Sequence, residues 1–176
     1  MILLSLGTHQ QAFLRALDLV EPLACGGADF VIQHGSTPPR PEMPNTVWIE
    51  FMPYENVVDA MARADSVVCH AGVGTIMTAL KAGHTPVVIP RQAQHGEHVD
   101  DHQRDIATRF AERGLVRCVT TETDLATLLT PRGENGGRKL GKGSNELRRA
   151  VADAVAAEPA TRRRLPSLSL KRKLDH

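Results

Sequence analysis

The segment VVCHAGVGT, residues 67–75, combines an apolar run with one histidine and two closely spaced glycines. Gly72 and Gly74 carry no side chain, so their backbone N–H groups can come close to a ligand. A helix predicted to begin near Thr75 would direct its unpaired N–H groups and the positive end of its dipole to the same place, which favours phosphate. His70 and Thr75 would add a ring nitrogen and a hydroxyl group. A tight turn with Thr75 as the helix cap uses the same residues, so this motif alone leaves both interpretations open.

A second polar segment, RQAQHGEHVDDHQ, residues 91–103, is rich in histidine and acidic residues. His95, His98 and His102 have the spacing i, i+3 and i+7, which is one face of a helix, so a metal site is one hypothesis. The segment is not the His-Glu-x-x-His motif, because only two residues separate His95 from His98. A solvated start of a polar helix and the recognition of a bound sugar are the other hypotheses, and we favour the last. Arg91 could pair bidentately with a phosphate or a carboxylate.

The two polar segments lie between apolar runs and segments of helical periodicity, which alternate along the chain and must position these residues. The alternation predicts an α/β fold, a Rossmann-like parallel sheet of about six strands with helices on both faces. Ligands bind outside the carboxyl ends of the strands in such sheets, and both polar segments fall there. The predicted strands are residues 2–6, 29–33, 46–49, 66–69, 86–89 and 116–119, and the predicted helices are 10–20, 56–64, 75–82, 97–112, 122–129 and 145–157.

The composition changes along the 176-residue chain. We expect one domain over residues 1–130, a flexible segment rich in Gly, Lys and Arg over 131–144, a helix over 145–158 and a basic tail over 159–176. The formal net charge of +1 argues against extensive nucleic-acid binding. The tail, however, has six Lys or Arg residues and one acidic residue, Asp175. A basic end on a neutral-to-acidic body favours docking on an anionic surface.

Cysteine usage and hydropathy indicate a cellular compartment. The three cysteines are an odd number and widely spaced, which favours reduced thiols in the cytoplasm over disulfides or a metal site. The apolar start MILLSLG has no basic residues before it and is too short for a signal peptide. No segment approaches the roughly 20 apolar residues of a membrane span. We therefore expect a cytoplasmic protein, at most peripheral at the inner face of a membrane.

Several motifs in the same order carry a family resemblance: HAGVGT, then ALKAGHTPVVIPR, then DDHQ. Together they resemble the glycosyltransferase family 28 C-terminal domain, the donor-binding half of GT-B glycosyltransferases, over about residues 1–130. The start, LLSLGTHQQAFLRALDLV, is similar to the small cytosolic subunit of the two-part GlcNAc transferase of dolichol-linked glycan synthesis. RQAQHGEHVDDHQ is similar to the small subunits of bacterial exopolysaccharide glucuronosyltransferases.

The resemblance implies a UDP-sugar donor site whose residues fall into three groups. For the diphosphate it implies Gly7, Thr8, His9, His70, Gly72, Gly74 and Thr75. For the uridine it implies Phe51, Met52 and Thr78. For the sugar it implies Arg91, Glu97, His98, Asp101, His102 and Gln103.

One position departs from the family pattern. The ribose-binding Glu of the family falls on Thr78, which cannot form the charged bidentate contact. Glu97 or Asp101 is the acid that we expect to replace it. The resemblance implies no metal and no cofactor, because helix dipoles and basic side chains neutralise the leaving diphosphate in such enzymes. It assigns no catalytic residue, since the catalytic base lies mostly in the other half of the fold.

The implied function is that of a hexosyltransferase subunit. It would move glucuronate or GlcNAc from the UDP-sugar to a lipid-linked polysaccharide precursor. The sequence begins at the first predicted strand of the donor domain, so we expect a separate, membrane-anchored acceptor-binding subunit and activity only with that partner. Two alternatives are a non-catalytic α/β nucleotide-binding protein and a nucleotide-sugar epimerase-like fragment. Full activity of the chain alone on a free UDP-sugar would favour the epimerase.

Overall fold

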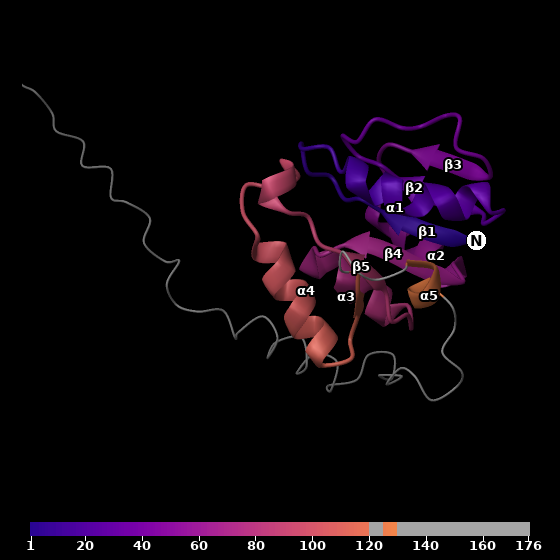
Figure 1. The fold of residues 1–176 in the computed structure, drawn as a ribbon. Helices are drawn as coiled ribbons and strands as arrows, with labels where there is room; N and C mark the ends of the chain where they lie inside the picture. The colour runs from indigo at the N-terminus through magenta and orange to yellow at the C-terminus, as the bar shows by residue number, and fades with distance from the viewer. Residues whose placement is uncertain (120–124, 130–176) are drawn as a thin grey trace, which may run out of the picture.

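The computed structural model describes residues 1–119 and 125–129, and these residues form a sandwich of helices around one sheet (Figure 1). The described part holds a six-stranded sheet in the order β3-β2-β1-β4-β5-β6, in which every neighbouring pair is parallel. This confirms the predicted α/β class and the parallel, Rossmann-like sheet. The strands are β1 (Ile2–Ser5), β2 (Phe30–Gln33), β3 (Thr46–Ile49), β4 (Ser66–His70), β5 (Val87–Ile89) and β6 (Arg117–Cys118).

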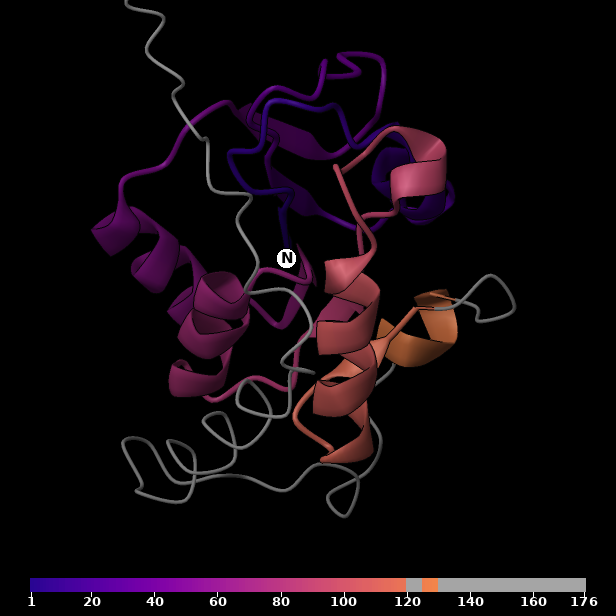
Figure 2. The same ribbon diagram turned by 90° about the vertical axis from the view of Figure 1, so that its left-hand side faces the viewer.

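The helices cover both faces of the sheet, as predicted. They are α1 (Leu14–Cys25), α2 (Tyr54–Arg63), α3 (Val73–Lys81), the short 3-10 helix η1 (Ala93–His95), α4 (His102–Glu112) and α5 (Leu125–Leu129). Figure 2 views the molecule from the carboxyl ends of the strands, with α2 and α3 on one side of the sheet and α1 and α5 on the other. In the same view α4 stands in front of the sheet, and Gln103 in its first turn accepts a hydrogen bond from Ala71 N–H, directly after β4.

Alternate residues of the central strands supply the two halves of the core, because side chains of a strand point to opposite faces. Leu4 of β1 packs with Leu17 of α1 and with Leu125 of α5. On the other face, Leu3 of β1 packs with Met61 of α2 and Ala79 of α3. The central strands read as near-continuous apolar runs because both of their faces are buried.

The order of the strands reverses between β1 and β4. The chain winds from β1 outward to β3, then returns to place β4 against the free edge of β1, with Ser5 paired to Cys69. In open parallel sheets the loops at such a reversal diverge and leave a crevice at the carboxyl ends of the strands. The loops after β1 and β4, which begin at Leu6 and Ala71, are therefore the ones that the topology separates.

The first helix starts and ends later than predicted. The predicted helix 10–20 is α1 over Leu14–Cys25, because Phe13 has an extended φ of −125° and its N–H bonds to Thr37 Oγ1. Pro22 lies inside the helix rather than beyond it. Pro22 is exposed and has no N–H group, so the helix loses one backbone hydrogen bond near its end. The last turn still closes, because Gly26 N–H donates to the Pro22 carbonyl.

The remaining predictions for the carboxyl-terminal part are tested only in part. The predicted helix 122–129 is described over Leu125–Leu129. The flexible segment 131–144, the helix 145–158 and the basic tail 159–176 lie outside the described residues. Within residues 1–119 and 125–129, every helix is too short or too polar to cross a bilayer.

Candidate functional site

A cleft of about 380 Å³ opens at the carboxyl edge of the sheet, at the crevice between β1 and β4. Its volume lies in the lower part of the range of roughly 300–1,000 Å³ for small-molecule sites. It collects eight of the residues that the sequence singled out: Gly7, Thr8, Phe51, Met52, His70, Gly74, Thr75 and Thr78. Four further lining residues were not predicted: Ser5, Gln33, Tyr54 and Val57.

The amino-terminal turn of α3 forms one wall of this cleft. Gly72 is the N-cap, and no side chain of the described residues caps the helix there. The first hydrogen bond of the helix runs from Ile76 N–H to the Gly72 carbonyl, so the N–H groups of the first turn have no partner within the helix. A Cβ built on Gly74 meets no atom within 4 Å, because it would project into the cleft. An anion can therefore reach both these N–H groups and the positive end of the dipole.

His70 lies between two glycines at the floor of the cleft. A Cβ on Gly7 would lie 2.7 Å from Cε1 of the His70 ring, and a Cβ on Gly72 would overlap its Nε2. Gly7 also has a φ of +78°, which disfavours any other residue. Gly72 was predicted to admit a phosphate, and the structure adds that its missing side chain makes room for the imidazole.

The imidazole of His70 is neutral at physiological pH. Burial lowers its pKa to about 4, and the electrostatic effects of Arg91, His9 and His98 act in the same direction. The Ser5 carbonyl, 3.4 Å from His70 Nδ1, has the opposite but weaker effect. If Nδ1–H donates to this carbonyl, Nε2 holds a lone pair and gains a proton only when an anion arrives. An anion in the cleft would therefore raise the pKa of His70.

Gln33 is a site residue that the sequence analysis missed. Its Oε1 accepts from Ser5 Oγ at 3.0 Å and from Gly7 N–H at 3.2 Å. Its Nε2 donates to the Gly7 carbonyl at 3.1 Å and to the Glu50 carbonyl at 3.2 Å. The buried amide thus joins the loop after β1 to the segment after β3, and holds Gly7 in its left-handed conformation. A polar residue at the end of an otherwise apolar strand is the signal that could have identified it.

The other end of the cleft is aromatic and exposed. Phe51 and Tyr54 are 66% and 64% exposed, and Met52 lies between them in the sequence. Exposed aromatic faces of this kind bind flat rings by stacking. Thr78 lines the cleft nearby, but its hydroxyl donates to the Gly74 carbonyl at 2.9 Å, so only its oxygen lone pairs remain for a ligand.

Arg91 is buried, which the sequence analysis did not anticipate. It is 1% exposed, and its guanidinium donates to the carbonyls of Gln11 (2.7 Å), Glu97 (2.9 Å) and Leu6 (3.0 Å). The guanidinium also lies over the Phe13 ring, 4.6 Å from its centroid. Three backbone carbonyls occupy its terminal nitrogens, so Arg91 holds loops together and does not line the cleft with the residues predicted for the diphosphate.

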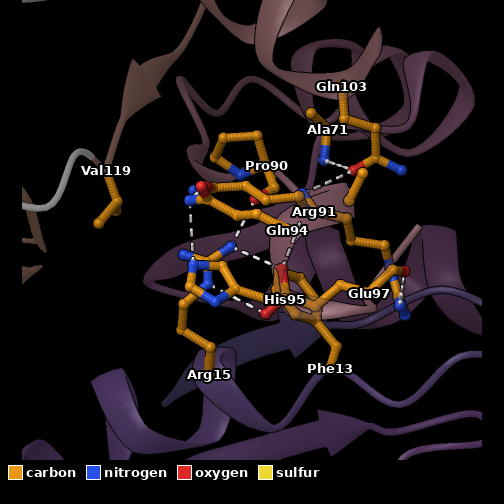
Figure 3. A network of polar contacts seen from close by, with 12 residues as sticks. Phe13, Arg15, Ala71, Pro90, Arg91, Gln94, His95, Glu97, Gln103 and Val119 are labelled. Atoms are coloured by element: carbon orange, nitrogen blue, oxygen red, sulfur yellow. Dashed lines mark hydrogen bonds and ion pairs between the residues drawn. The ribbon is translucent and has the colours of Figure 1, made fainter. Parts of the chain in front are cut away.

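Glu97 and Gln103 belong to the same buried network. The Glu97 carboxylate accepts from Arg15 Nε and NH2 at 3.0 and 2.8 Å and from Gln92 N–H at 3.0 Å. Gln103 Oε1 accepts from the N–H groups of Ala71 and Arg91 at 3.1 and 3.2 Å. In Figure 3 the amide nitrogen of Gln103 points away from these two contacts.

Among the described residues, those that line the cleft around Thr78 include no acid. The Glu97 carboxylate is paired with Arg15, and Asp101 Oδ1 accepts from Ala93 N–H at 2.9 Å. Both acids lie outside the set of residues that lines the cleft. The expected replacement of the family's ribose-binding acid is therefore not provided by Glu97 or Asp101 in this arrangement.

The histidine-rich segment is a loop rather than the start of a helix. The predicted helix 97–112 begins only at His102, and residues 97–101 form bends after η1, whose C-cap Gly96 has a left-handed φ of +66°. His95 and His98 precede α4, so the predicted single helix face of His95, His98 and His102 is wrong. Among residues 1–119 and 125–129, no group of three or more His, Cys, Asp or Glu side chains is arranged to hold a metal ion.

His98 instead meets His9, which follows β1. Their ring centroids are 4.7 Å apart at an interplanar angle of 36°. His98 Nδ1 lies 3.1 Å from Asp100 Oδ1. Burial lowers the pKa of His9, and His98 and Arg91 lower it further. Two residues predicted for different parts of the site are thus brought into contact.

Comparison with known proteins gives a family and a fold. Residues 1–157 match the family model described as glycosyltransferase family 28 C-terminal domain. No curated protein matches the chain. Solved structures with the same fold include the glycotransferase of kitacinnamycin (TM-score 0.59, 21% identity), SnogD from Streptomyces nogalater (0.52, 22%) and the calicheamicin glycosyltransferase CalG4 (0.57, 17%).

These structures are much longer than the chain. The alignments cover 87%, 87% and 88% of the chain but only 39%, 38% and 38% of the three relatives, in the same order. The chain therefore spans about two fifths of the length of the solved structures that it matches. At these identities the likeness establishes the fold alone.

Proposed function

The chain belongs to the glycosyltransferase family 28 C-terminal domain family, and we propose that it binds the UDP-sugar donor of a glycosyltransferase. One observation carries this proposal: the uncapped amino terminus of α3, with Gly74 open to the cleft, at the crevice between β1 and β4. A diphosphate is the ligand group that best satisfies several free N–H groups and a positive dipole end together.

The diphosphate would lie across the turn after β4 and the loop after β1. The N–H groups of the first turn of α3 and the hydroxyls of Thr8 and Thr75 would donate to it. His70 would contribute a donor once protonated, and an anion at this distance favours that protonation. His9 and the backbone at Gly7 complete the set proposed for the diphosphate.

The uridine would lie at the aromatic end of the cleft. Phe51, Met52 and Tyr54 offer an apolar surface on which a uracil ring can stack. Thr78 would accept one hydrogen bond from the ribose, since its own proton is donated to Gly74. With no acid at this position, we expect weaker ribose recognition than a carboxylate would give, because hydrogen bonds to charged groups are roughly twice as strong.

The sugar would extend toward the loop before α4. His98, His102 and the amide nitrogen of Gln103 are the groups proposed to read it, while Arg91, Glu97 and Asp101 would act indirectly by holding that loop. The favoured sugars are glucuronate and GlcNAc. A basic, histidine-rich loop suits a carboxylate, and an amide donor suits the hydroxyl and acetamido groups of either sugar.

Sugar transfer would need a second half that binds the acceptor. Donor and acceptor must be held in line in a closed, water-poor cleft, and the described cleft has exposed aromatic residues on its rim. We propose that a membrane-anchored subunit supplies this half together with a lipid-linked saccharide acceptor, and that the product is a hexosyl linkage. No metal, cofactor or nucleic acid is part of the proposal.

In this mechanism the chain stabilises the leaving group. As the bond between the sugar and the β-phosphate breaks, negative charge grows on the UDP oxygen. Preorganised N–H groups and the dipole of α3 stabilise that charge more than they stabilise the bound donor, which lowers the barrier. The group that deprotonates the acceptor would come from the other half, so we assign no catalytic residue to this chain.

The test is co-purification with the proposed membrane-anchored subunit, followed by a panel of UDP-sugars with a lipid-linked acceptor. We expect saturable turnover of one UDP-sugar by the complex and none by the chain alone. Transfer by the purified chain alone at the rate of the complex would contradict the need for a partner. Full turnover of a free UDP-sugar without any acceptor would favour the epimerase alternative.

The proposed location is the inner face of the cytoplasmic membrane. Its support is the basic segment 159–176, since each Lys or Arg near an anionic leaflet contributes about 1 kcal/mol. We expect deletion of 159–176 to release the protein from anionic vesicles and to leave UDP binding intact. Equal vesicle binding with and without this segment would contradict the proposed location.

A further inference from the structure

Gln33 lies at the carboxyl end of β2, between the two other strands of this half of the sheet. The parallel register places it beside Ser5 of β1 on one side and Ile49 of β3 on the other. Its side chain is 5% exposed and lines the cleft. It can therefore reach the segments that leave both neighbouring strands, which are the loop with Gly7 and the segment that begins at Glu50.

The amide of Gln33 has no capacity left for a ligand. A glutamine amide accepts two hydrogen bonds at its oxygen and donates two from its nitrogen. Here Oε1 accepts from Ser5 Oγ and Gly7 N–H, and Nε2 donates to the carbonyls of Gly7 and Glu50. Groups of the chain itself thus fill all four positions. Gln33 therefore acts on a bound ligand only through the groups that it holds.

Gly35, two residues further on, contacts the same two segments. Its N–H donates to the Glu50 carbonyl at 2.9 Å, so this carbonyl accepts from both Gly35 and Gln33. A Cβ built on Gly35 would overlap the Gly7 carbonyl oxygen, and the φ of Gly35 is +55°. Only glycine allows this close approach of the two backbones. The turn after β2 is therefore packed tightly between the loop after β1 and the segment after β3.

These two segments carry the two ends of the proposed donor site. The loop after β1 contributes Gly7, which is proposed for the diphosphate, and the segment after β3 contributes Phe51 and Met52, which are proposed for the uridine. The hydrogen bonds of Gln33 connect Gly7 to Glu50, which directly precedes Phe51. The separation of the two ends thus depends on the turn after β2, and on the Gln33 amide in particular.

We propose that Gln33 is a positioning residue that couples the diphosphate end of the donor site to its uridine end, an inference that rests on the proposed function. UDP spans both ends, and it binds well only when their separation is held at the length of the ligand. A fragment that touches one end has no such requirement. The amide thus favours a nucleoside diphosphate over a free nucleoside or a free diphosphate, although it contacts neither.

The experiment measures the Kd of UDP, uridine and inorganic pyrophosphate by NMR titration of the wild-type chain and of Gln33→Met, which removes all four hydrogen bonds. We expect the Kd of UDP to rise about tenfold or more, within the roughly 5–150-fold typical of coupled sites, and the Kd of each fragment to change less than about threefold. A loss for one fragment as large as the loss for UDP would overturn the coupling, because Gln33 would then serve that end alone. An unchanged Kd for UDP would overturn any positioning role.

Thr37→Val is the matched control. Thr37 is 1% exposed and its Oγ1 accepts from Phe13 N–H at 3.1 Å, so the substitution also removes a buried hydrogen bond between the connections that follow β1 and β2. Both residues lie outside the set that lines the cleft. Thr37→Val should lower the denaturant midpoint of unfolding and leave the Kd of UDP unchanged. A loss of UDP affinity equal to that in Gln33→Met would show that any weakening of these loops impairs binding, contrary to a specific role of Gln33.

Gly35→Ala perturbs the same turn and leaves Gln33 in place, so it tests the inference even if Gln33→Met fails to fold. The added methyl group would displace the loop at Gly7, and UDP binding should weaken more than uridine binding. Wild-type affinity for UDP in folded Gly35→Ala would overturn the inference and leave the donor site standing. Failure of the wild-type chain to bind UDP would overturn the proposed function together with the inference.

Discussion

Replacing Gly74 with alanine should change stability and ligand binding in opposite directions. Gly74 is a helical residue of α3, and a Cβ there meets no atom within 4 Å. Alanine in a helix is more stable than glycine by about 0.5–1 kcal/mol, mainly because glycine loses more backbone freedom on folding. With no clash to offset this gain, the free energy of unfolding should rise.

Binding of UDP should weaken in the same variant. The new methyl group would occupy the space through which a phosphate approaches the N–H groups of α3. A hydrogen bond between an N–H group and a charged oxygen contributes about 1.5–3 kcal/mol, so loss of one such bond raises Kd by roughly tenfold to a hundredfold. Gly74→Val adds more bulk at the same position and should lower affinity further.

Gly72→Ala is the matched comparison. The backbone of Gly72 is in the ordinary extended region, at φ −74° and ψ 124°, so alanine causes no backbone strain. Its Cβ would, however, overlap the His70 ring and force that ring to move. Overpacking of this kind costs about 1–3 kcal/mol, so Gly72→Ala should lower stability where Gly74→Ala raises it.

Calorimetric titration with UDP and denaturant unfolding measure the two quantities on the same samples. An unchanged Kd for UDP in a folded Gly74→Val variant would refute the position of the phosphate at the start of α3. A loss of stability in Gly74→Ala would show that the space beside Gly74 is occupied, contrary to the structure.

Three further predictions concern stability, sugar recognition and the buried network. Because the pKa of His70 falls from 6.5 to about 4 on folding, its neutral form contributes stability that is present above pH 6.5 and is lost as pH falls toward 4; the loss amounts to at most about 3 kcal/mol. Unfolding free energies between pH 8 and pH 4 should therefore be flatter for His70→Asn, and parallel profiles would contradict the prediction. Gln103→Ala should weaken UDP-sugar binding more than UDP binding by calorimetry, and equal losses would contradict a contact with the sugar. Arg91→Met should lower the free energy of unfolding by about 3–5 kcal/mol, since it leaves three buried carbonyls without their donor. A loss of less than about 1 kcal/mol would show that water replaces the guanidinium.

The sheet could be predicted from the sequence because its strands are uniformly apolar. The predicted strand 46–49 is β3 over Thr46–Ile49, and the other strands shift by no more than one residue at either end. The ends of α1 and α4 were less predictable, because tertiary contacts decide them. Phe13 bonds to Thr37, which is remote in the sequence, and the left-handed Gly96 interrupts a segment whose polar composition is compatible with a helix.

Some residues of the candidate site could likewise be predicted from the sequence, and others could not. Gly7, His70 and Gly74 were predictable because short loops after strands β1 and β4 meet where the strand order reverses. The burial of Arg91 was not, since the carbonyls that it binds come from two loops far apart in the sequence and no local pattern marks them. The contact between His9 and His98 depends on those loops too.

A titration of the ¹⁵N-labelled protein with UDP, followed by two-dimensional ¹H–¹⁵N NMR, tests most directly whether the chain is a nucleotide-sugar donor domain. We expect saturable shifts of the backbone amides of Gly7, Thr8, Gly74 and Thr75, and of those near Phe51 and Met52. Binding of UDP without shifts at Gly74 and Thr75, or no saturable shifts at any UDP concentration, would contradict it.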